Sequence, residues 1–192
     1  MGAVFQSLGR SVAAGVVLVI LMVLALRGGK FDHAWGTFFM RWLHVLCGVM
    51  WVGLLWYFNF VQIPSMPKIP DEQKPAVSKV IAPEALFWFR WAALATVVTG
   101  ILLSFMNGSI GFALTFQQPY VAIGIGMWIA LLMAFNVWFI IWPNQKKALG
   151  MVIVEAAQKA AAARLAMLTS RFNTMLSIPM LYAMTTYQTL PA

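Results

Sequence analysis

The stretch "RWLHVLCGVMWVGLLWYFNF", residues 41–60, decides the fold. It is apolar almost throughout, and about 20 mostly apolar residues suffice for a helix to cross a bilayer. A histidine, His44, nevertheless lies one helical turn inside it. An ionisable side chain turned toward lipid costs about 2.5–3.5 kcal/mol even on a lenient insertion scale, so such a group faces protein instead. The stretch therefore predicts a membrane-spanning helix with one face in a bundle interior.

This face can be followed along the whole predicted helix. Seven residues recur at intervals of three or four and share it: Arg41, His44, Gly48, Trp51, Leu55, Asn59 and Gln62. Every strongly polar residue of the segment belongs to this stripe, which fits the helical period. We expect the stripe to point into the bundle.

The composition places the whole chain in a membrane. Of its 192 residues, 62% are hydrophobic and 9% are charged, and the mean hydropathy is +0.83, which is typical of integral membrane proteins. The net charge of +8 comes from thirteen Lys and Arg, which gather at the ends of apolar runs as topology signals and lipid contacts. We therefore expect the lipid bilayer as a partner and exclude nucleic acid.

The chain has one cysteine, Cys47, inside an apolar run. An intrachain disulfide is thus excluded, as is the Cys-x-x-Cys-His motif that attaches a c-type haem. The sequence also contains no full set of metal ligands, and any redox cofactor must be held in another way.

The apolar runs predict an all-α fold, a polytopic membrane helix bundle forming one domain over residues 1–192. Its expected transmembrane helices, about five, lie near residues 11–27, 41–63, 85–106, 119–142 and 171–188. An alanine-rich amphipathic helix is expected near residues 146–169, where Glu155 and Lys159 are four residues apart. It can lie on the cytoplasmic face or extend the fifth helix inward.

The distribution of basic residues predicts the orientation. One set of loops and termini carries most of them: Arg10, Lys68, Lys74, Lys79, Lys146, Lys147, Lys159, Arg164 and Arg171. The opposite side carries only Arg27, Lys30 and Arg41. By the positive-inside rule the N-terminus is cytoplasmic and the C-terminus lies on the opposite, periplasmic side.

Small residues four apart mark faces where membrane helices approach closely. Two such rows occur, Thr96, Gly100 and Ser104 in the third predicted helix, and Gly126, Ala130 and Ala134 in the fourth. We interpret both rows as the contact between these two helices.

His44 is the first candidate site residue. A neutral imidazole is a common axial ligand of b-type haem and also binds copper or zinc. The only other histidine, His33, lies in the preceding loop, so two facing histidines are not available. This leaves a haem with His44 as its single axial ligand, or one whose second ligand is a methionine. The alternative is that His44 only forms hydrogen bonds to a carbonyl or a polar side chain of another helix.

A second candidate site lies at the expected cytoplasmic ends of four helices. The polar residues gathered there are Asn59, Gln62, Glu84, Arg90, Asn136, Asn144, Arg171 and Asn173. Arginines framed by amides can hold a planar anion through bidentate hydrogen bonds, and Arg90, Asn59, Asn136 and Asn173 are the expected ligand-binding residues. The alternative is an internal hydrogen-bond network.

These residues also lie in segments that carry a family resemblance. The segments are "RWLHVLCGVMWVGLLWYFNFVQIP", "PEALFWFRWAALATVVTGILL", "YVAIGIGMWIALLMAFNVWFIIWPNQKKALG" and "SRFNTMLSIPMLYAM", within residues 40–184. They resemble the membrane-bound urate hydroxylase family in its N-terminal membrane region, the urate oxidase N-terminal domain. The resemblance implies a bacterial inner-membrane protein, and in complete members urate oxidation with electrons leaving through a fused cytochrome c.

No counterpart of that cytochrome c region follows the fifth predicted helix. The resemblance therefore leads us to expect a non-autonomous subunit of a larger membrane redox complex. The alternative is a urate-hydroxylase-like oxidoreductase, or a b-type haem protein, that passes electrons to a separate cytochrome c. A weaker similarity, His44 on an early helix followed by Gly48 and Trp51, links the chain to the haem-dependent protoporphyrinogen oxidases.

Overall fold

The computed structural model describes residues 2–186, and every regular element in that part of the chain is a helix. The predicted all-α fold is thereby confirmed. The chain divides into two compact units, Met1–Phe38 and Phe39–Ala192, and each is described by itself.

The first unit contains the short α1 (Gly2–Phe5) and the apolar α2 (Leu8–Arg27). Helix α2 ends at Gly28, whose φ of 54° is left-handed and whose N–H bonds the carbonyl of Leu24, a common way to end a helix. No residue of α2 is buried. Its 20 residues, most of them apolar, are long enough to cross a membrane.

Helix α3 (His33–Trp56) begins before residue 41, where the apolar run starts. Asp32 explains the earlier start, because its Oδ1 accepts a 2.7 Å hydrogen bond from the backbone N–H of Trp35 and so caps the first turn. The same rod continues through η1 (Tyr57–Gln62), a π-helix, then α4 (Ile63–Ser65) and η2 (Met66–Lys68).

The remaining elements form three further rods. The first consists of α5 (Lys74–Ala76), the π-helix η3 (Val77–Ile81) and α6 (Ala82–Met106). After the short α7 (Ile110–Leu114), the second consists of α8 (Val121–Phe135), the π-helix η4 (Asn136–Ile141) and α9 (Trp142–Ala148). The third is α10 (Ala156–Thr186).

Helix α10 joins two predicted elements into one. Its 31 residues run without interruption from the alanine-rich segment into the fifth predicted span, so the segment extends that helix. Residues 187–188, the predicted end of the span, lie outside the described part. Within residues 2–186, four helical segments are long and apolar enough to cross a membrane: Leu8–Arg27, His33–Lys68, Lys74–Met106 and Val121–Ala148.

The apolar half of α10 contains polar residues that lower its hydropathy. Ser170, Asn173 and Ser177 are nevertheless buried, the last two completely. Because these side chains face protein rather than lipid, their polarity does not prevent this half of α10 from lying in a bilayer.

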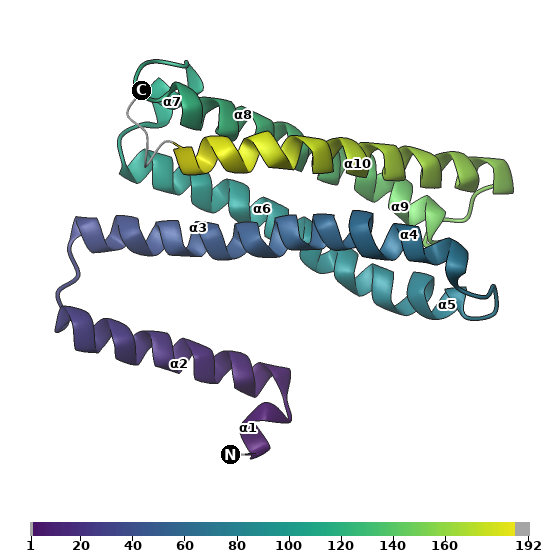
Figure 1. Cartoon of the computed structure of the whole chain (residues 1–192), viewed down its shortest axis with the longest axis horizontal. Coiled ribbons are helices and arrows are strands. Elements are labelled where there is room, and N and C mark those ends of the chain that lie inside the picture. The colour runs from purple at the N-terminus through teal and green to yellow at the C-terminus, as the bar shows by residue number, and fades with distance from the viewer. Residues whose placement is uncertain (1, 187–192) are drawn as a thin grey trace. The chain divides into compact units, whose positions relative to one another are not determined.

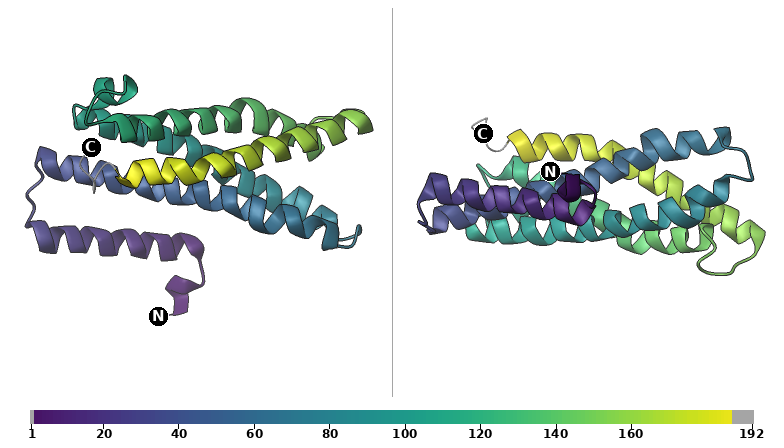
Figure 2. Two further views of the ribbon diagram at one scale, coloured as in Figure 1. Left: turned by 45° about the horizontal axis from the view of Figure 1, so that its top comes forward. Right: turned by 90° about the horizontal axis from the view of Figure 1, so that it is seen from below.

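In the second unit, α8 and α10 run side by side and α6 crosses α3 (Figures 1 and 2). Trp51 and Leu55 are fully buried, and no residue of the predicted α3–η1 stripe is exposed. The stripe therefore faces the bundle, as predicted. Phe58 meets Phe89 of α6 edge to face, with ring centroids 5.6 Å apart.

The two rows of small residues pack differently from our interpretation. Gly100 and Thr96 face α3, since a Cβ at Gly100 would lie 2.8 Å from Cε1 of His44 and one at Gly48 would lie 3.9 Å from Cγ2 of Thr96. Gly126 instead faces α10, since a Cβ at Gly126 would lie 3.3 Å from Cβ of Ala183. The interpretation was wrong for Thr96, Gly100 and Gly126, because spacing shows that small residues share one face of a helix without showing which helix packs against that face.

Candidate functional site

His44 is held by backbone and side-chain atoms of α6. Its Nδ1 lies 2.9 Å from the carbonyl oxygen of Thr96 and 3.2 Å from Oγ1 of Thr99. Since a carbonyl can only accept, Nδ1 carries the proton and Nε2 carries the lone pair. The hydroxyl of Thr99 already donates to the carbonyl of Ala95 at 2.7 Å, so it also acts as an acceptor toward Nδ1.

Gly100 makes this position possible. An added Cβ would lie 2.8 Å from Cε1 and 3.1 Å from Nδ1 of His44, closer than real Cβ contacts. The imidazole therefore lies directly against the α6 backbone. No hydrogen bond is formed by Nε2 to any residue within 2–186.

The predicted amide layer is brought together by α10. Nδ2 of Asn136 donates to Oδ1 of Asn173 at 2.8 Å, and Nδ2 of Asn173 donates to the carbonyl of Met133 at 3.0 Å. One turn away, Nδ2 of Asn59 donates to Oγ of Ser170 at 2.8 Å. Two of the predicted ligand-binding amides thus bond each other, while Oδ1 of Asn59 is buried without a partner.

Two hydroxyl groups of α10 extend this network. Nε1 of Trp56 donates to Oγ of Ser177 at 3.0 Å, and Ser177 donates to the carbonyl of Thr174 at 2.6 Å. Ser170 and Ser177 are seven residues apart on one face of α10. The sequence analysis missed both, although their spacing with Asn173 is the signal that could have found them.

Asn59 and Asn136 both lie in π-helical segments, η1 and η4. Such wide turns are frequent at functional sites. Each of η1, η3 and η4 ends two residues before a proline, namely Pro64, Pro83 and Pro143. A proline ring clashes with the carbonyl four residues earlier, and the wider turn moves that carbonyl away. Proline inside an apolar run is therefore the sequence signal for these turns.

Arg90 is the buried charged residue of the described bundle. It is 9% exposed, and its Cζ lies 3.4 Å from the ring centroid of Trp142 in α9, a close cation–π stack. Within residues 2–186 it forms no hydrogen bond or ion pair, and its Nη1 is buried without a partner. All five carboxylate side chains of the chain are exposed, so none neutralises it.

Glu84, the acidic residue nearest to Arg90 in the sequence, does not pair with Arg90. Its Oε1 accepts a 3.0 Å hydrogen bond from Nε1 of Trp88 at the surface. A second cation lies near the same indole ring, because Nζ of Lys146 is 5.6 Å from the ring centroid of Trp142. Two cations therefore share one indole ring, and the sequence analysis missed both Lys146 and Trp142.

The remaining predicted residues do not join this group. Asn144 donates to the carbonyl of Ile140 in its own helix at 2.8 Å, and Arg171 is exposed. Gln62 and Arg41 each have a buried atom without a hydrogen-bond partner, Oε1 and Nε respectively.

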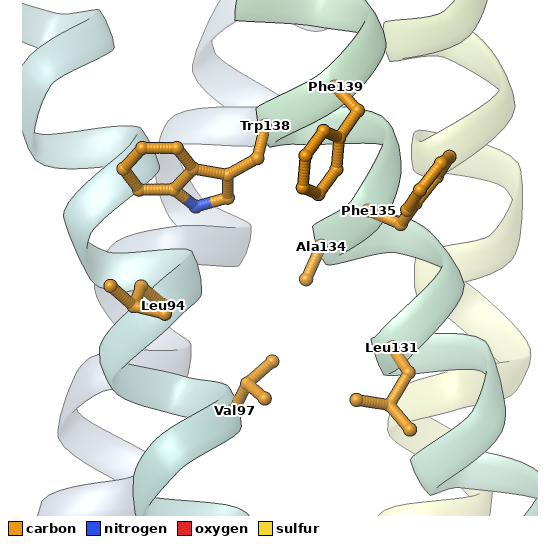
Figure 3. A pocket seen from close by; sticks show the side chains of 7 residues that line it. All are labelled: Leu94, Val97, Leu131, Ala134, Phe135, Trp138 and Phe139. Atoms are coloured by element: carbon orange, nitrogen blue, oxygen red, sulfur yellow. The ribbon is translucent and has the colours of Figure 1, made fainter.

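An apolar groove of about 400 Å³ lies between α6 and the α8–η4 rod (Figure 3). Its lining residues are Leu94, Val97, Leu131, Ala134, Phe135, Trp138 and Phe139. The ring of Trp138 reaches across toward α6, with its nitrogen edge on the groove side (Figure 3). That Nε1 is buried without a hydrogen-bond partner.

Comparison with known protein families gives a match over part of the chain. Searches of curated proteins and of solved structures found no match. The matched part of the chain contains Asn136, Trp142 and Asn173, whereas His44 and Arg90 precede it. Over residues 104–188 the chain matches the family model described as urate oxidase N-terminal, which confirms the resemblance to that family for this part of the chain.

Proposed function

We propose that this chain is a membrane component of a redox system and holds haem b through Nε2 of His44. The observation that carries the proposal is the hydrogen bond from Nδ1 to the carbonyl of Thr96, 2.9 Å long. Metal-ligating histidines typically donate their other ring N–H to such an acceptor, which fixes the tautomer and raises the basicity of the ligand nitrogen. Haem bound there would supply one-electron transfer.

The residues around His44 fit this role. Thr96 and Thr99 hold the protonated edge of the ring, and Gly100 lets the ring lie against the helix backbone. Nε2 makes no competing hydrogen bond within residues 2–186. A single axial histidine is sufficient for a b-type haem, as in globins and peroxidases.

The test is spectroscopic. Protein purified from haem-replete cells should show a Soret band and a pyridine haemochrome spectrum of haem b, and His44→Ala should abolish both. His33→Ala is the matched control, since it removes the other histidine, and it should keep the spectrum. Purified wild-type protein without bound haem would contradict the proposal.

The electron acceptor in this proposal is a separate protein, either a cytochrome c or another membrane subunit of the bacterial inner membrane. The family resemblance supports a cytochrome c as acceptor, because complete members of the membrane-bound urate hydroxylase family carry a fused cytochrome c. Gentle solubilisation followed by native gel electrophoresis and mass spectrometry tests it. Co-migration with a haem-containing or larger oxidoreductase is expected, whereas a fully active particle containing this chain alone would contradict it.

A second candidate function is binding of an anionic purine such as urate at Arg90. Two observations favour it: the family match and the buried guanidinium without a counter-charge. Isothermal titration calorimetry with urate and xanthine on wild type and Arg90→Gln is the direct test. Binding to wild type that Arg90→Gln removes is expected, and no heat at millimolar ligand would contradict it.

A further inference from the structure

The groove and the Arg90–Trp142 stack are neighbours on the same two rods. Leu94 and Trp138 line the groove, and each lies four residues, about one helical turn, from Arg90 and Trp142 respectively. The rings of Trp91 and Trp138 also meet edge to face, with centroids 5.5 Å apart, which ties the rods together at this level. A long molecule lying in the groove would therefore reach the two cations at one end.

The groove has the character of a hydrocarbon site. Leucine, valine, alanine and phenylalanine make up its lining apart from Trp138. Phe135 and Phe139 are exposed on the bundle surface, so the groove opens toward the surrounding acyl chains rather than to a sealed interior. Nε1 of Trp138 lies on the groove side, is itself covered by its neighbours and has no hydrogen-bond acceptor in the described residues. It can only donate a hydrogen bond.

The stack next to the groove lacks a negative charge. An arginine whose residue surface is nine-tenths buried in a membrane protein is normally paired, because an unpaired buried charge is costly. Arg90 stacks on Trp142, Lys146 lies near the same ring, and no carboxylate pairs with either cation in the described residues. Stacking on an indole leaves the guanidinium N–H groups free at its edge, where they can donate to an anion.

We propose that this site binds an anionic phospholipid. The phosphate lies between Arg90 and Lys146, an ester carbonyl accepts the hydrogen bond of Trp138 Nε1, and one acyl chain fills the groove along Leu94, Val97 and Leu131. Phosphate, ester and chain follow one another in a phospholipid in this order. Basic pockets between helices recognise anionic headgroups in this way, and the ester satisfies an indole N–H that is otherwise buried and unpaired.

This inference is independent of haem at His44 and competes with an anionic purine for Arg90. Both ligands supply the missing negative charge. Only the lipid also occupies the apolar groove and the Trp138 N–H, and this difference favours the lipid. Substitutions in the groove should therefore weaken binding of the lipid but not of the purine.

The experiment uses full-length protein, delipidated in a neutral detergent. Melting temperature and native mass spectrometry are recorded with phosphatidylglycerol, with phosphatidylcholine of the same chains, with inorganic phosphate and with urate. We expect phosphatidylglycerol to stabilise the protein and to remain bound in the mass spectrometer. Equal effects of the two lipids, or a shift of the same size with phosphate or urate, would overturn the proposal.

Four variants locate the site. Lys146→Gln should weaken phosphatidylglycerol binding about fivefold, the usual effect of one basic residue near an anionic headgroup, and Arg90→Gln should weaken it at least as much. Lys147→Gln is the matched control, because Lys147 is the exposed neighbour, and should bind normally. Ala134→Phe fills the groove while keeping both cations, and should remove lipid binding without affecting a soluble anion.

Arg90→Gln can also lower the stability of the protein. If this variant fails to fold, the binding measurements on Lys146→Gln and Ala134→Phe test the proposal. Unchanged phosphatidylglycerol binding in both would contradict the proposal. Loss in Lys146→Gln together with normal binding in Ala134→Phe would also contradict it, because the anion would then be bound without its chain.

Discussion

Asn136 and Asn173 are each other's partners: Nδ2 of Asn136 donates a 2.8 Å hydrogen bond to Oδ1 of Asn173 in the buried contact between η4 and α10. Asn173 is completely buried and also donates to the carbonyl of Met133. The pair therefore connects the α8–η4 rod to α10 at Asn136, where the π-helix η4 begins.

Asn173→Ala should destabilise the bundle by about 1–3 kcal/mol, because it leaves the buried amide N–H of Asn136 without its acceptor and removes the side-chain bond to the carbonyl of Met133. Asn136→Ala removes only one of the two bonds and should cost less, about 1 kcal/mol, in line with hydrogen bonds between membrane helices. Unfolding in mixed micelles with increasing denaturing detergent measures both. Asn144→Ala, which loses only a bond within its own helix, is the control and should unfold near wild type.

Gly124→Ala should destabilise the contact between α7 and α8. A Cβ at this position would overlap the carbonyl oxygen of Ala113, and a backbone atom cannot move aside as a flexible side chain can. Overpacking of this kind costs about 1–3 kcal/mol. Thermal unfolding in detergent is the measurement. Gly111→Ala has open space at its Cβ and should be near neutral; equal melting temperatures for the two variants would show that the close approach does not exist.

Gly100→Ala should displace the imidazole of His44 and break its hydrogen bond to Thr96. If His44 ligates haem, the variant should lose haem or shift its reduction potential, because the Nδ1 partner tunes the basicity of the ligand nitrogen. Redox titration followed at the Soret band measures this. Gly48→Ala lies in the same helix contact but at an ordinary 3.9 Å from its neighbour. Gly48→Ala should keep the wild-type reduction potential. A wild-type potential in Gly100→Ala as well would argue against His44 as the haem ligand.

The orientation prediction can be tested along the α8–α9 rod. Gln117 precedes α8 and Lys147 lies near the end of α9, so they mark opposite ends of one candidate span. In a Cys47→Ala protein, Gln117→Cys should react with an impermeant maleimide added to spheroplasts, and Lys147→Cys only after the membrane is permeabilised. The reverse pattern would place the basic ends outside.

Much of the helical layout could be predicted from hydrophobic patterning. The α3 stripe is an example, because a side chain's place in the 3.6-residue period determines which face it shares, and Trp51 and Leu55 are indeed fully buried. Helix ends were less well predicted. Asp32 starts α3 early through a single capping bond to Trp35, a local effect that an average over an apolar run does not register.

The partners of each face were decided only by the tertiary structure. Periodicity places Gly126 on a face of small residues, but the approach of Ala183 depends on how α10 packs. Likewise, the sequence alone placed Asn59, Arg90, Asn136 and Asn173 in one layer. The structure pairs Asn136 with Asn173, bonds Asn59 to Ser170 and leaves Arg90 on Trp142 without a counter-charge. The physical reason is that hydropathy and spacing are properties of one helix, whereas hydrogen bonds and close packing depend on the mutual position of two.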